Sequence, residues 1–77
     1  ALAYESLRAG GNRSCVLNAA NEVVVDAFLK DQVGFLEMSD IIEQTLDKVE
    51  FITTPTLDDY LETDRVARLI TKEIIKD

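Results

Sequence analysis

Several residue types on which catalytic and metal sites depend are scarce or missing in this sequence. Its 77 residues contain no histidine, no tryptophan, one proline and a single cysteine, Cys15. Without histidine, neither a Ser-His nor a Cys-His nucleophilic pair can be built. A lone cysteine forms no intramolecular disulfide, and no second Cys or His accompanies it as a metal ligand. We therefore interpret Cys15 as a small, partly buried apolar residue near a helix start, which fits a reducing compartment.

Long apolar runs and basic clusters are missing as well. Glu22 and Asp26 interrupt the most apolar segment, and no run approaches the ~18 residues of a membrane span. Fifteen acidic residues oppose eight basic ones, giving a net charge of −7. Because this charge repels phosphate backbones, we expect neither a nucleic-acid partner nor a membrane partner. The chain carries no signal peptide at its start and begins as if inside a helix, so we expect a piece of a longer protein.

The most apolar segment, Leu17 to Leu29, is predicted to be the central helix. Its valines 23–25 alone would suit a strand, but the alanine-rich flanks continue a helical period beyond the usual strand length. Its polar residues Asn18, Glu22 and Asp26 recur every four positions, with Asn21 beside them, so they form one narrow stripe. Apolar residues cover most of the remaining circumference, which predicts a helix buried nearly all round.

The other elements follow from caps and breakers. We predict four main helices, at about 1–9, 16–30, 39–49 and 65–76, and one short helix at 57–61. Gly10-Gly11 ends the first, Ser14 caps the second, and Ser39 opens the third. Thr56 and Asp59 form a capping box, and Thr63 or Asp64 caps the last helix. With no confident strand, the chain is predicted to be a small all-α bundle.

Two helices show clear core faces from their helical spacing. The predicted core residues are Met38, Ile41, Ile42, Leu46 and Val49 in the third helix, and Val66, Leu69, Ile70 and Ile74 in the last.

The polar stripe is the one constellation that could carry chemistry. Glu22 and Asp26 could bind a hard cation through oxygen. Alternatively, the stripe could hydrogen-bond to loop backbone or pack against a neighbouring domain, and we favour this second interpretation. The acidic pair Asp58-Asp59 is explained by its place at a helix start.

The block Leu17-Asn18-Ala19-Ala20-Asn21-Glu22, followed by Val25 to Leu29, resembles the C-terminal domain of 1-deoxy-D-xylulose 5-phosphate reductoisomerases. The resemblance spans essentially the whole chain, and the six-residue block is its most specific part. Supporting features are Gly10-Gly11, the turn ending in Phe35, Ser39-Asp40-Ile41, Pro55 to Asp59, and Asp64 to Arg68.

The resemblance implies a parent enzyme of non-mevalonate isoprenoid biosynthesis. Such enzymes convert 1-deoxy-D-xylulose 5-phosphate to 2-C-methyl-D-erythritol 4-phosphate with NADPH and Mg²⁺ or Mn²⁺. They work as homodimers in bacterial cytoplasm or in plastids, and combine a dinucleotide-binding domain, a central catalytic domain and a C-terminal helical bundle.

None of the family's catalytic, cofactor-binding or metal-binding motifs matches a position in 1–77. We therefore assign residues 1–77 to the C-terminal helical domain, inactive alone and supporting the catalytic domain of the same chain. Asn18, Asn21 and Glu22 are predicted to have a structural role. The alternatives are a free-standing acidic helical protein-interaction module, a cation-binding regulatory domain and, as the weakest, a small independent enzyme.

Overall fold

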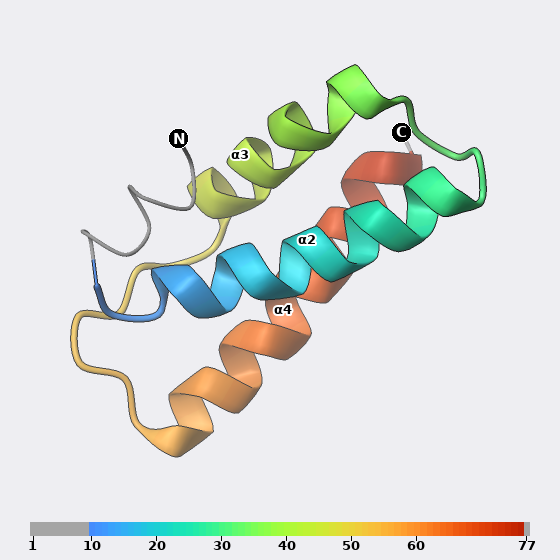
Figure 1. Ribbon diagram of the computed structural model, residues 1–77. Helices are drawn as coiled ribbons and strands as arrows, with labels where there is room; N and C mark the ends of the chain where they lie inside the picture. The colour runs from blue at the N-terminus through green and yellow to red at the C-terminus, as the bar shows by residue number, and fades with distance from the viewer. Residues whose placement is uncertain (1–9, 77) are drawn as a thin grey trace.

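The computed structural model of the protein describes residues 10–76, which form three α-helices and one short 3₁₀ turn. They are α2 (Arg13–Leu29), η1 (Phe35–Glu37), α3 (Met38–Lys48) and α4 (Leu57–Lys76). α3 runs back against α2, and α4 crosses α2 while running in the same general direction (Figure 1). α4 also contacts α3. Residues 10–76 contain no strand, which confirms the all-α prediction. The helix predicted at 1–9 lies outside the described residues.

α2 is the central helix, as predicted, because it packs against both α3 and α4. Small side chains make this possible: Ala19 and Ala20 are completely buried and let the neighbouring helices approach closely. The expectation that α2 is buried nearly all round is wrong, however. Its outer side is open, and Phe28 and Leu29 are exposed there. Two neighbours can cover only part of a helix's circumference.

The predicted core face of α3 is confirmed, since Ile41, Ile42, Leu46 and Val49 are buried and Met38 packs against them. The predicted cap is wrong, because α3 begins at Met38 rather than after Ser39. The turn η1 leads directly into α3. The N–H of Gly34, the residue before η1, donates a hydrogen bond of 2.7 Å to the Glu37 carboxylate.

The short helix and the last helix are one continuous helix, α4, which corrects the predicted count. The two candidate caps serve other purposes inside it. Thr63 is buried, and the Asp64 carboxylate accepts a 3.0 Å bond from Arg68 one turn later. Because neither side chain turns back onto the backbone, nothing interrupts the helix.

The inner face of α4 also differs from prediction. Leu69 is half exposed, while the smaller Ala67 and Thr71 are buried against the other helices. Val66, Ile70 and Ile74 pack against the core as expected. Helical spacing alone does not show whether Leu69 or Ala67 is buried. Burial there depends on how closely α2 approaches α4, and the small Ala67 side chain fits at the contact.

The predicted capping box at the start of α4 is confirmed. The Asp59 N–H donates to Thr56 Oγ1 at 3.1 Å, and the Thr56 N–H donates to Asp59 Oδ2 at 2.9 Å. Both bonds satisfy donors that a helix start leaves without an intrahelical partner.

Candidate functional site

The polar stripe lies on the outer side of α2. Asn18, Asn21, Glu22 and Asp26 are all exposed. Asp26 pairs with Lys30 of its own helix at 3.0 Å. Among residues 10–76, neither Asn18 nor Asn21 forms a side-chain hydrogen bond, so the loop-backbone contacts expected for them are not seen there.

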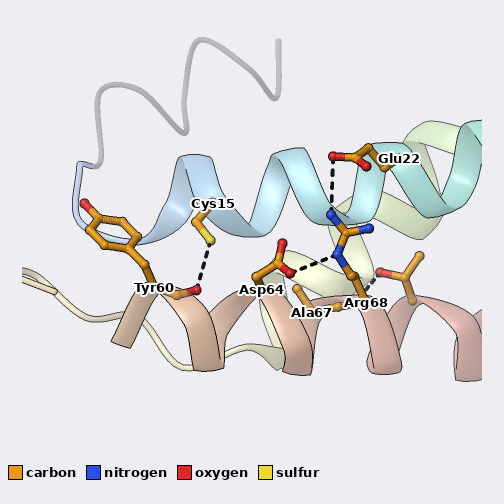
Figure 2. Close-up of polar contacts among 7 residues, drawn as sticks. Cys15, Glu22, Tyr60, Asp64, Ala67 and Arg68 are labelled. Carbon is orange, nitrogen blue, oxygen red and sulfur yellow. Dashed lines mark hydrogen bonds and ion pairs between the residues drawn. The ribbon is translucent and has the colours of Figure 1, made fainter. Parts of the chain in front are cut away.

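Glu22 connects α2 to α4 through Arg68, as Figure 2 shows. Arg68 Nη2 lies 3.3 Å from Glu22 Oε2, and Arg68 Nε lies 3.0 Å from Asp64 Oδ2. The hydrogen bond to Asp64, and to a smaller extent the one to Glu22, raises the pKa of the Arg68 guanidinium above its ordinary value. The Glu22 carboxylate therefore forms an ion pair that joins α2 to α4. The part of the chain from 10 to 76 holds no cluster of three His, Cys, Asp or Glu side chains suited to a metal ion.

Cys15 is partly buried and faces α4 (Figure 2). Its thiol donates to the Tyr60 carbonyl oxygen, with Sγ 3.6 Å away. Burial raises the pKa of the Cys15 thiol, Asp64 raises it further, and Arg68 partly opposes them. The thiol is thus held in its protonated, weakly nucleophilic form, which agrees with the interpretation of Cys15 as a packing residue.

The asparagine that ties down loop backbone is Asn12, which directly precedes α2. Asn12 is completely buried. Its Nδ2 donates to the Glu50 carbonyl at 2.9 Å and to Thr63 Oγ1 at 3.1 Å. Its Oδ1 accepts from the Ile52 N–H at 2.8 Å. One side chain therefore joins the start of α2, the α3–α4 connection and α4.

Gly11 makes the approach of these segments possible. Its φ is +59°, and a Cβ at this position would stand 2.2 Å from the Ile52 carbonyl oxygen. The adjacent Asn12 N–H donates to that same oxygen at 3.1 Å. The Gly-Gly-Asn sequence before a helix is the signal that could have identified this junction. The predicted cap Ser14 instead lies inside α2, which begins at Arg13.

Exposed carboxylates pair with exposed guanidinium or ammonium groups, and buried polar groups bond to one another. No helix within residues 10–76 is both long enough and apolar enough to cross a membrane.

Comparisons with known proteins identify the family of the chain. The family model described as the DXP reductoisomerase C-terminal domain matches residues 1–70. The chain is 60% identical to a 1-deoxy-D-xylulose 5-phosphate reductoisomerase of Bacteroides fragilis, over 97% of this chain and 19% of that protein. It is 57% identical to the reductoisomerase of Phocaeicola vulgatus, over 97% of this chain and 20% of that protein.

A solved structure agrees with these relatives. It is the 1-deoxy-D-xylulose 5-phosphate reductoisomerase of Zymomonas mobilis in complex with NADPH, which superimposes with a TM-score of 0.88 at 42% identity. The match covers 99% of this chain and 20% of that one. The chain thus spans about a fifth of the length of the relatives it matches. It belongs to the DXP reductoisomerase C-terminal domain family.

Proposed function

We propose that this chain is the supporting C-terminal helical domain of an enzyme that converts 1-deoxy-D-xylulose 5-phosphate to 2-C-methyl-D-erythritol 4-phosphate. The observation that carries the proposal is the family match over residues 1–70, joined to relatives five times longer that bear this activity in their names. The parent protein is an NADPH-dependent oxidoreductase and isomerase of isoprenoid biosynthesis. This domain supports the catalytic domain of the same chain and is inactive alone.

NADPH and the divalent cation, Mg²⁺ or Mn²⁺, bind elsewhere in the parent chain under this proposal. The described residues do not fit either group. Glu22 is paired with Arg68, and the Gly11 backbone is closed against the Ile52 carbonyl, so it leaves no cradle for a phosphate. We further propose that the parent enzyme is a homodimer, as the family resemblance implies, and that it works in the bacterial cytoplasm, since the relatives named above are bacterial.

An assay of the purified 77-residue chain tests whether catalysis requires the rest of the parent enzyme. Incubated with NADPH, Mn²⁺ and 1-deoxy-D-xylulose 5-phosphate, it is expected to oxidise no NADPH. Turnover by these residues alone would overturn the proposal.

A chimera tests the assignment in the other direction. The C-terminal fifth of the Bacteroides fragilis enzyme is replaced by this chain, and the chimera is expected to keep its reductoisomerase activity. A second chimera carrying Asn12→Leu is the matched control, because it should lose activity only as far as it loses folded protein. A folded but inactive first chimera would contradict the assignment.

A further inference from the structure

The exposed sides of the helices differ in chemistry. On α3 the exposed positions are all polar or charged: Ser39, Asp40, Glu43, Gln44, Asp47 and Lys48. On α2 the open side carries Asn18, Asn21, Glu22, Val25 and Leu29, which we call the α2 outer face. Leu29 is 73% exposed and Val25 is 36% exposed. The α2 outer face thus combines apolar and amide side chains with the charge of Glu22 and of the neighbouring Asp26, whereas the exposed side of α3 is wholly polar or charged.

Apolar exposure continues beyond α2 into the next turn. Phe28 flanks the α2 outer face and meets Phe35 of η1 edge to face, with ring centroids 6.2 Å apart. Leu36 follows and is 91% exposed. Single exposed leucines are ordinary, but several adjoining apolar side chains with a polar border mark an interaction surface.

The polar residues of the α2 outer face also suit an interaction surface. The amides of Asn18 and Asn21 have donors and acceptors that no residue of 10–76 uses. A groove of about 560 Å³ runs beside Asn21, between the outer side of α2 and Arg68 and Lys72 of α4, and Glu22 and Asp26 line it as well. Apolar side chains bordered by such groups are the composition of a protein interface.

We propose that the α2 outer face, with η1 beside it, is where the catalytic part of the parent chain docks. The proposal rests on the function proposed above. The length of chain outside this domain selects the occupant: the relatives are about five times longer than the matched region, so about four fifths of the parent chain lies outside this domain and is available to contact it. A contact within one chain is favoured over a second copy because the linked segment is present at high effective concentration.

Thiol accessibility in the full-length parent enzyme tests the proposal. Cysteines are introduced singly as Asn21→Cys and Leu29→Cys in a background lacking the native cysteines, Cys15 included. Gln44→Cys on the exposed side of α3 is the matched control. We expect maleimide to label positions 21 and 29 at least about tenfold more slowly than position 44, because a covered thiol reacts only when the contact opens. Equal rates at all three positions would overturn the proposal, and would leave a face open to a separate partner.

A photo-cross-linker on the same cysteines identifies what covers them. A benzophenone at position 29 should join a peptide from the part of the enzyme that precedes this domain. A cross-link within residues 1–77, or protection that disappears on dilution, would instead indicate this chain or a second copy and would overturn the proposal. The enzymatic assay is scored separately, so an inactive enzyme with protected cysteines would count against the proposed function and not against the docking surface.

Discussion

At the scale of single residues, two asparagines show that the role of a side chain depends on its position in the fold. Asn12 is completely buried and uses both Nδ2 donors and its Oδ1 acceptor. Asn18 is exposed on α2. The reasoning that buried asparagine secures irregular backbone holds for this protein, but it applies to Asn12 and not to the stripe that the sequence suggested.

Replacing each asparagine with leucine tests this difference. Asn12→Leu leaves the Ile52 N–H and the Glu50 carbonyl without their partner, so the free energy of unfolding should fall by about 2–4 kcal/mol. Asn18→Leu should change it by less than about 0.5 kcal/mol. Urea denaturation of the chain measures both values, and equal losses would contradict the role of Asn12.

Asp31 is the one non-glycine residue of 10–76 with a positive φ, at +60°. It ends α2 in a Schellman arrangement, in which the Gln32 N–H donates to the Ala27 carbonyl at 2.8 Å and the Asp31 N–H to the Phe28 carbonyl at 3.1 Å. Asp31→Gly should therefore raise the free energy of unfolding by about 0.5 kcal/mol. The control Asp47→Gly, inside α3, should lower it by about 1 kcal/mol. Thermal unfolding followed by circular dichroism compares the two, and a loss in both would refute the argument.

Cys15 makes stability depend on pH. Because burial and Asp64 raise the pKa of its thiol in the folded chain, the native state holds this proton more tightly than the unfolded state. The resulting stabilisation is present below the ordinary thiol pKa and is lost as pH rises through the folded value. Wild-type stability should thus fall relative to that of Cys15→Ser as pH rises above the ordinary thiol pKa of about 8.5. Parallel pH profiles for the two proteins would show that the thiol is not perturbed.

At the scale of elements, glycine and proline correctly marked two segments that are not helical, although the break predicted near Thr63 does not exist. Gly10 and Gly11 both have positive φ, and the segment around Pro55 connects α3 to α4 without helix. These features depend on the backbone preferences of glycine and proline, which act within a few residues. Capping residues were less reliable. Ser14, Ser39 and Thr63 can all cap a helix, yet each lies within one.

The confirmed cap gives an element-scale prediction. Thr56→Ala removes the oxygen that accepts from the Asp59 N–H, and should lower the free energy of unfolding by about 1 kcal/mol. Thr56→Ser keeps this oxygen and is the matched control. Guanidinium denaturation should place the serine variant close to wild type, and an equal loss in both variants would assign the effect to the threonine methyl group instead.

At the scale of the whole molecule, a buried hydroxyl pair joins α3 to α4. Thr45 Oγ1 and Thr71 Oγ1 lie 3.0 Å apart. Each hydroxyl oxygen also lies within hydrogen-bond distance of a carbonyl of its own helix, Thr45 Oγ1 3.0 Å from the Ile41 oxygen and Thr71 Oγ1 2.7 Å from the Ala67 oxygen. Since each hydroxyl has one proton, one threonine donates across to the other while its partner donates within its own helix. The pair is a polar contact in an otherwise apolar core, and helical spacing could not reveal that the two threonines face each other.

A double-mutant cycle tests the pair. Thr45→Val and Thr71→Val should each cost about 1 kcal/mol, while the double variant should cost less than their sum, because replacing both hydroxyls leaves neither unsatisfied. Thr54→Val, at an exposed position, is the control and should change little. Strict additivity in urea denaturation would show that the hydroxyls do not interact.

For the candidate site, the sequence indicated the family but not what the side chains contact. The Leu17–Glu22 block was sufficient to suggest the family, because a sequence pattern carries ancestry whatever its side chains contact. Its structural role could not be read from the pattern, because that depends on which residues lie opposite. The structure places Glu22 against Arg68 and leaves Asn18 and Asn21 on the open side of α2.

The residue pattern along the chain was enough to indicate that it is helical, that the segments at Gly10-Gly11 and around Pro55 are not, and to which family it belongs. Helical period, glycine and proline act locally, and family resemblance lies in residue identity. The packing of the helices was needed to establish that α4 is continuous through Thr63, that Asn12 is the buried asparagine and that α2 keeps one face open. Each of these depends on what packs across from a residue, and the spacing of residues along a chain does not specify its neighbours in space.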